Sequence, residues 1–181
     1  MLIAANNLHA LSNFAAVANE YCKFVDSWHD GRPAKLYSKL EELLARLHVA
    51  ILPVEQETPD RKRRKFEKLE MTRNQYYAIT KVIGATVGQE AVPLFEMHLG
   101  TRPEADEVQK WLASRAEMLD DDLTDIYRDL HNGLEFWEVN TLDGQIEAAW
   151  QWRFQYEAHW GKHLFNAMTT IHEARYRLYA D

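Results

Sequence analysis

The segment EAHWGKH, residues 157 to 163, contains side chains of the kind that bind metal ions. His159 and His163 are four positions apart, so a helix would place both imidazoles on one face. Metal sites in helical bundles need further ligands from a facing helix, where carboxylates project inward. The histidine pair therefore has two interpretations, a metal clamp or a structural pair beside the core.

The richest source of carboxylates is DDDLTDIYRDL, residues 120 to 130. At about 100° per residue in a helix, Asp122 and Asp129 flank the apolar stripe on the same side, whereas Asp125 is expected to point away. Arg115 falls on the Asp122 flank and could neutralise one carboxylate in a salt bridge. Solvated or ion-paired acids explain this pattern without a metal.

Two charged residues, Arg153 and Glu157, fall inside the apolar stripe of the last predicted helix. Charged side chains are rarely buried unless they are paired. Arg153 could pair with Glu157, four residues later, or with an aspartate of the acidic helix. We expect Arg153 to be ion-paired, because an unpaired buried guanidinium would cost several kcal/mol.

These side chains define a candidate functional groove between the acidic helix and the last helix. Its residues are Asp122, Asp129, Arg153, Glu157, Trp160 and His163. A metal-binding version of the site would use Asp122, Asp129, Glu157, His159 and His163. The chain has no Glu-x-x-His motif, and Trp160 follows His159 where a zinc protease has glutamate. The sequence therefore favours a structural histidine pair, with no metal and no cofactor.

Length and composition are typical of a globular protein. The chain has 181 residues, 46% hydrophobic and 27% charged, which is enough to bury a core in a single domain spanning residues 1–181. The tryptophans are predicted to lie in the core. They are Trp28, Trp111, Trp137, Trp150, Trp152 and Trp160.

The formal net charge of −7 argues against general binding to nucleic acid or to an anionic membrane. One basic run stands out, namely Arg61, Lys62, Arg63, Arg64 and Lys65. It is interpreted as a solvated polar helix or loop, with a local anion or RNA contact as the alternative. Cys22 is the single cysteine, which excludes an intramolecular disulfide. With no targeting or membrane-spanning segment evident, the sequence predicts a cytoplasmic protein.

Helical periodicity dominates the N-terminal half. Apolar residues at three- and four-residue steps predict a helix over about residues 7–28 and a second one from Pro33 to Ile51, paired as an antiparallel hairpin. Thr72 and Gln75 form a capping box that should start a third helix.

Glycine and proline are expected to interrupt the helices of the second half. Residues 88–104 are predicted to form a connecting loop, and a helix over 104–132 should stop or kink at Gly133. The last helix begins after Thr141, and Gly161 is a candidate bend. The predicted fold is all-α, a bundle of about six helices with a long C-terminal helix.

Three segments resemble a family of bacterial helical proteins known only as a domain of unknown function. These segments are FAAVANEYCKFVDS, DDLTDIYRDL and HWGKHLFNAMTTIH. The resemblance implies a cytoplasmic helical protein without assigned chemistry, and it supplies no catalytic residues.

Two functions from different classes compete. The absence of a recognised catalytic motif and the abundance of aromatic residues favour an interaction or adaptor module that binds another protein. The alternative is a metal-dependent helical hydrolase, with its carboxylate and histidine site between the acidic helix and the last helix.

Overall fold

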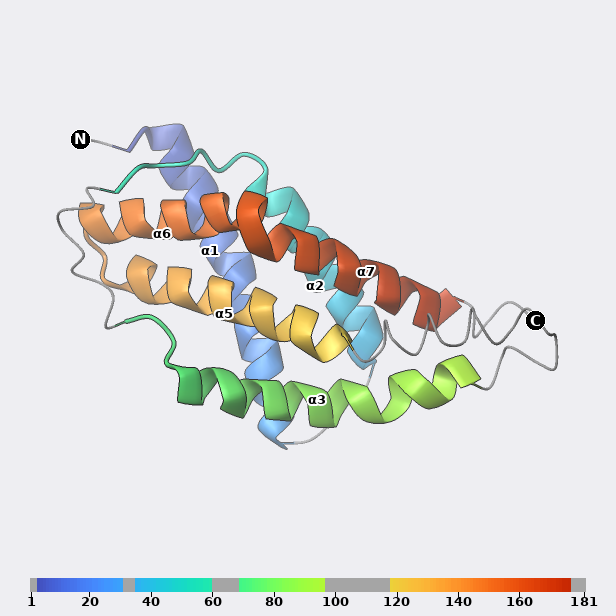
Figure 1. The fold of residues 1–181 in the computed structure, drawn as a ribbon. Helices are drawn as coiled ribbons and strands as arrows, with labels where there is room; N and C mark the ends of the chain where they lie inside the picture. The colour runs from blue at the N-terminus through green and yellow to red at the C-terminus, as the bar shows by residue number, and fades with distance from the viewer. Residues whose placement is uncertain (1–2, 31–34, 60–68, 97–117, 177–181) are drawn as a thin grey trace.

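The protein is a bundle of helices packed around α5 (Figure 1). The structure, a computed structural model, describes residues 3–30, 35–59, 69–96 and 118–176. Its α-helices are α1 (Ala5–Asp26), α2 (Leu36–Ile51), α3 (Arg73–Glu96), α5 (Leu119–Glu138), α6 (Leu142–Gln155) and α7 (Gly161–Tyr176). A 3-10 turn, η1 (Ser27–Asp30), follows α1, and a π-helical turn, η3 (Tyr156–Trp160), joins α6 to α7. The described residues form no strand, and the predicted all-α fold with a long C-terminal helical segment is confirmed.

Helix α5 lies at the centre because α1, α3, α6 and α7 all pack against it. The phenol of Tyr21 in α1 donates a hydrogen bond to the carbonyl oxygen of Leu123 at 3.1 Å. Tyr127 of α5 donates to the Asp26 carboxylate at 2.7 Å. Neighbours on several sides enclose polar as well as apolar faces of this helix, which is the condition for an internal polar site.

The predicted helix starts are confirmed where the structure describes them. The backbone N–H of Thr72 donates to Gln75 Oε1 at 2.9 Å, and the N–H of Gln75 donates to Thr72 Oγ1 at 3.4 Å. Thr141 caps α6 by accepting a hydrogen bond from Gly144 N at 3.2 Å. The predicted hairpin of α1 and α2 is also present, since Asn7 near the start of α1 bonds to Glu55 beyond the end of α2.

The loop predicted from residue 88 is wrong over residues 88–96, because α3 continues through Gly84 and Gly88 to Glu96. Buried Ile79, Ile83 and Val87 fix this helix against the core, and this packing overrides the weak helix propensity of glycine. Residues 97–104 of the predicted loop lie outside the described residues, as does the predicted start of the acidic helix at residue 104.

Gly133 was predicted to stop or kink its helix, but α5 continues past it to Glu138. The indole of Trp152 lies directly on this glycine. A Cβ atom at Gly133 would be 2.0 Å from Trp152 Nε1, which donates to the carbonyl oxygen of Leu130 at 3.2 Å. The glycine therefore serves close helix packing rather than termination.

The predicted irregularity near Gly161 is a π-helical turn that ends at the preceding residue, Trp160. The backbone N–H of Gly161 reaches back to the carbonyl oxygen of Tyr156. A Cβ atom at Gly161 would lie 2.3 Å from that oxygen, so the absence of a side chain permits the turn. The π turn carries His159, and π turns in helices occur frequently at functional sites.

Candidate metal centre

Three aspartates on one face of α5 form one wall of the candidate site. Asp122, Asp125 and Asp129 are all buried, with side-chain exposures of 4%, 11% and 4%. Residues three and seven positions apart lie about 60° and 20° from each other around a helix. The three carboxylates therefore share a face that borders the apolar stripe of Leu123 and Ile126.

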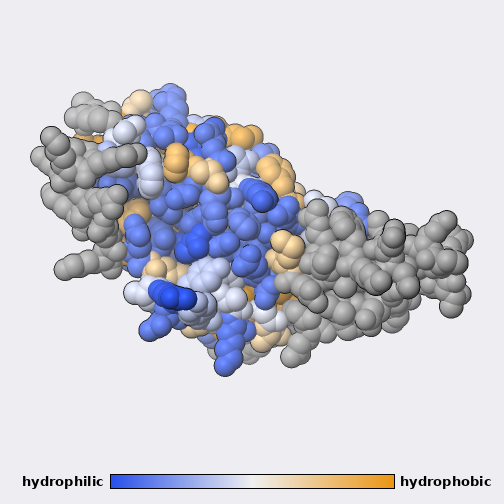
Figure 2. All heavy atoms as spheres, viewed as in Figure 1, coloured by the Kyte–Doolittle hydropathy of each residue, from blue (hydrophilic) through white to orange (hydrophobic). Residues whose placement is uncertain are grey.

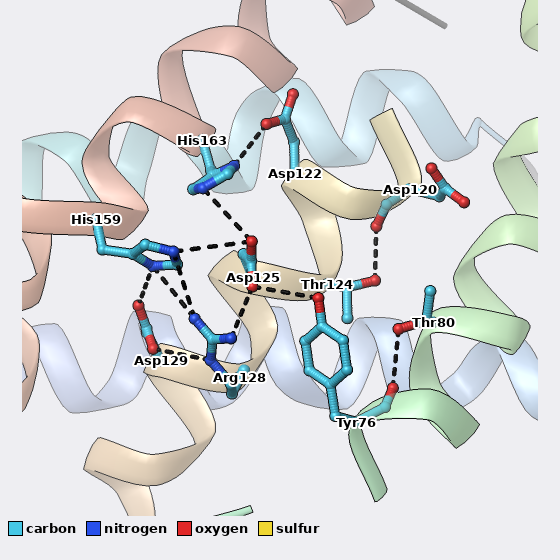
Figure 3. Close-up of polar contacts among 10 residues, drawn as sticks. All are labelled: Tyr76, Thr80, Asp120, Asp122, Thr124, Asp125, Arg128, Asp129, His159 and His163. Atoms are coloured by element: carbon cyan, nitrogen blue, oxygen red, sulfur yellow. Dashed lines mark hydrogen bonds and ion pairs between the residues drawn. The ribbon is translucent and has the colours of Figure 1, made fainter. Parts of the chain in front are cut away.

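The expectation that Asp125 points away is wrong. Asp125 is three residues from Asp122, which makes the two side chains neighbours on the helix surface. Helix α3 covers this side of α5, and the phenol of Tyr76 donates to Asp125 Oδ1 at 3.3 Å. Asp125 consequently lies at the middle of the polar cluster (Figure 3).

Each histidine of the last helical segment is paired with one aspartate of α5. His159 Nδ1 lies 2.8 Å from Asp129 Oδ2, and His163 Nδ1 lies 2.7 Å from Asp122 Oδ1. These pairs show that α5 packs against the last helical segment. An ionised carboxylate can accept hydrogen bonds but cannot donate them, so the Nδ1 atom of each histidine carries the hydrogen.

The remaining imidazole nitrogens of both histidines face one oxygen of Asp125. His163 Nε2 lies 3.4 Å and His159 Nε2 lies 3.8 Å from Asp125 Oδ2. The three residues offer ligand atoms that all lie within 4.8 Å of one another. With hydrogen on Nδ1, a neutral imidazole presents a lone pair at Nε2, so two lone pairs and a carboxylate oxygen converge. A cation between these atoms would convert their mutual repulsion into attraction.

Arg128 and Tyr76 hold the other oxygen of Asp125. Arg128 Nη1 donates to Asp125 Oδ1 at 2.9 Å, and Arg128 Nε donates to Asp129 Oδ1 at 3.2 Å. Its guanidinium also lies 5.4 Å from the centre of the Tyr76 ring. Burial and the neighbouring Asp125 carboxylate raise the pKa of Tyr76 to about 12, so its phenol remains a donor at neutral pH.

Burial acts on the charges of the cluster. It raises the pKa of Asp122, while the hydrogen bond from His163 acts in the opposite direction. Three carboxylates and one guanidinium leave two negative charges uncompensated when both imidazoles are neutral. A divalent cation supplies that compensation, and so do two protonated histidines.

The structure brings together only some residues of the predicted groove. Arg153 pairs with Glu157 at 2.7 Å, which confirms that Arg153 is ion-paired, but its partner is neither Asp122 nor Asp129. Trp160 is fully buried and packs against Phe14. Asp122, Asp129, His159 and His163 are brought together, whereas Glu157 is engaged with Arg153. The predicted partner Arg115 lies outside the described residues, as does the basic run Arg61, Lys62, Arg63, Arg64 and Lys65.

The central positions of Asp125, Arg128 and Tyr76 in the cluster were not predicted from the sequence. The signal for Asp125 was available, because its three-residue spacing from Asp122 places both on one side of α5. Arg128 lies in the acidic segment of residues 120–130, where no sequence pattern marked it as a site residue. Tyr76 comes from α3, and nothing in its local sequence indicates which helix it will contact.

The region that carries the candidate site is similar to a known protein family. Residues 96–177 match the family model of a domain of unknown function, DUF5063. This match spans α5 to α7 and hence every candidate ligand. The predicted resemblance to an all-helical family without assigned chemistry is confirmed.

The fold has a counterpart among solved structures. The crystal structure of protein BF1032 from Bacteroides fragilis, a structural-genomics target, superposes with a TM-score of 0.71 and 14% sequence identity over 92% of each chain. This likeness shows a shared fold. Among curated proteins, no match to the chain is found. Within the described residues, none of the helices combines the length and apolar character needed to cross a membrane.

Proposed function

We propose that the protein binds a divalent transition-metal ion between α5 and the last helical segment. The ligands are His159 Nε2, His163 Nε2 and Asp125 Oδ2. The observation that carries the proposal is the convergence of two imidazole nitrogens on one carboxylate oxygen at 3.4 Å and 3.8 Å. A zinc ion about 2.0–2.2 Å from each ligand would separate tetrahedral ligands by about 3.4 Å.

The partners behind the ligands support the same proposal. Metal-binding histidines usually donate their second N–H to a carboxylate, which fixes the ring and raises its basicity. Asp129 takes this role for His159, and Asp122 takes it for His163. Arg128 and Tyr76 support Asp125 from its other oxygen. All three ligands therefore have a defined supporting contact.

Ligand chemistry favours zinc or another first-row ion over magnesium and calcium. Two imidazoles and one carboxylate suit zinc, iron, nickel or copper, whereas magnesium and calcium prefer oxygen ligands. Three protein ligands are typical of catalytic sites, in which the fourth position holds water or substrate. The metal-dependent alternative is consequently better supported than the adaptor role, and the proposal departs from the expectation that no cofactor is needed.

The adaptor role stays a prediction. An exposed tryptophan groove would support it. Of the described tryptophans, Trp28, Trp152 and Trp160 are buried, whereas Trp137 and Trp150 are partly exposed. Figure 2 shows a largely hydrophilic face in which apolar residues are scattered.

The proposal is tested by metal analysis of untagged protein, followed by titration with zinc, manganese and magnesium. We expect one equivalent of zinc to bind tightly, magnesium to bind weakly, and His163→Ala to abolish tight zinc binding. His9→Ala is the matched control, because His9 is exposed on α1 and contacts Asn13. Wild-type protein that binds no zinc at micromolar concentration would establish the structural interpretation of the histidine pair.

A further inference from the structure

Arg128 has one guanidinium nitrogen that pairs with no carboxylate of the described residues. Its Nη1 and Nε atoms bind Asp125 and Asp129. Among the residues that the structure describes, its Nη2 atom has polar contacts only with the ring nitrogens of His159, at 3.3 Å from Nδ1 and 3.5 Å from Nε2. This Nη2 atom is therefore the most weakly satisfied donor of the site.

Metal binding would change the surroundings of that nitrogen. His159 Nδ1 donates its hydrogen to Asp129 and cannot also accept one from Arg128. The remaining acceptor is the Nε2 lone pair, which a bound metal would occupy. The Nη2 donor would then lie beside the metal without an acceptor, and leaving a charged donor unsatisfied is costly.

We propose that the metal centre binds a small oxyanion, a carboxylate or phosphoryl group, with one oxygen on the metal and another accepting from Arg128 Nη2. This inference rests on the proposed metal-binding function. Guanidinium groups match the two-oxygen geometry of carboxylate and phosphate groups. A metal with three protein ligands retains a position for one of those oxygens.

Exposure and charge agree with this ligand class. The side chains of His159 and Arg128 are 34% and 31% exposed, so the same edge of the site is open to solvent. A divalent ion would balance the two uncompensated negative charges of the cluster. An incoming anion would then meet the metal and Nη2 without opposing net charge from these residues.

The test uses full-length protein loaded with Co²⁺, whose visible absorption reports its ligands. Acetate and methylphosphonate are titrated as carboxylate and phosphoryl probes, and imidazole serves as a neutral ligand for the same position. Variants Arg128→Lys and Arg128→Gln are compared with Arg73→Gln, an exposed arginine of α3 that contacts Tyr77. Co²⁺ affinity is measured separately for each variant, and oxyanion affinity is measured at saturating Co²⁺.

We expect at least one oxyanion to change the wild-type and Arg73→Gln spectra. Both Arg128 variants should bind it about tenfold more weakly, with imidazole affinity nearly unchanged. The probe that binds identifies the class, carboxylate or phosphoryl. If Co²⁺ binds and imidazole perturbs it but neither oxyanion does, the oxyanion inference fails while the metal centre stands. Equal oxyanion affinity in an Arg128 variant that still binds Co²⁺ also overturns it. Failure of wild-type protein to bind Co²⁺ or zinc rejects the metal centre itself.

Discussion

At the residue scale, the two oxygens of Asp125 have different roles. Oδ1 accepts hydrogen bonds from Arg128 and Tyr76, while Oδ2 faces the two histidines. Asp122 and Asp129 instead contact Nδ1 atoms and orient the rings. In the proposed site, one carboxylate therefore binds the ion and the other two position its histidine ligands.

Asparagine substitutions should reveal this difference. We expect Asp125→Asn to remove tight zinc binding, because it deletes a charged ligand. Asp122→Asn and Asp129→Asn should each weaken zinc by about 10–100-fold, the usual effect of losing a supporting contact. Competition with a chromophoric chelator measures all three affinities. Equal losses in the three variants would argue against this division of roles.

At the element scale, glycines set how closely the helices approach. Gly133 lies under the Trp152 indole within the central helix, whereas Gly84 of α3 faces the carboxylate end of Asp120. A Cβ atom at Gly84 would be 3.2 Å from Asp120 Oδ2, an atom at the end of a half-exposed side chain that can move.

Substitution by alanine should consequently destabilise the protein at Gly133 but not at Gly84. Gly133→Ala must displace Trp152, and overpacking of this kind typically costs about 1–3 kcal/mol. Gly84→Ala should be neutral or stabilising by up to about 1 kcal/mol, because alanine favours the helix. Urea unfolding followed by circular dichroism gives both free energies of unfolding. A tolerated Gly133→Ala would contradict the packing described for α5 and α6.

A charge contact that joins α1 to α2 makes stability depend on pH. Arg46 and Lys39 of α2 lower the pKa of Glu20 in α1 from 4.5 to about 2. A lowered acid pKa contributes stability that is present above the unfolded pKa and is lost as pH falls toward the folded pKa. The contribution should therefore disappear between about pH 4.5 and 2.

Glu20→Gln tests this linkage. Because Glu20 is 40% exposed, we expect the variant to be less stable than wild type at pH 7 by less than about 1 kcal/mol. The difference should vanish near pH 2 and shrink in high salt. Unfolding free energies measured from pH 2 to 7 check the sign. A difference that grows on acidification would exclude the proposed ion pair as its source.

At the scale of the whole molecule, we expect the fold to form without the proposed metal ion. One extensive apolar core contains residues from every α-helix of the described residues, including Trp152 of α6 and Leu164 of α7. Metal binding should therefore add stability to an already folded protein.

Zinc should raise the melting temperature without creating the fold. At a free zinc concentration 100 times Kd, linkage predicts about 2.7 kcal/mol of stabilisation. Thermal unfolding of metal-free protein, with and without zinc, measures the shift. We expect Asp125→Asn to lose the shift and His9→Ala to keep it. Loss of helical circular dichroism on chelation would show instead that the metal is required for folding.

Local sequence determined much of the fold. The spacing of Leu40, Leu44 and Leu47 predicts a helix because an apolar face must recur every three or four residues. The caps at Thr72 and Thr141 depend on side chains only three residues from their partners. Such features are set within one turn and require no knowledge of neighbouring helices.

The candidate site depended on tertiary structure. Helical periodicity places Asp122, Asp125 and Asp129 around one axis, but burial is decided by the neighbours that cover each side. Helix α3 encloses Asp125 and supplies Tyr76 from 49 residues away in the chain. Likewise, the structural role of Gly133 depended on the Trp152 indole that packs on it. The sequence by itself determined which helices form and which side chains could bind an ion. The crossing of α5 with the last helical segment decided that three of these side chains converge. The distances between them depend on contacts between segments far apart in the chain, which local sequence does not specify.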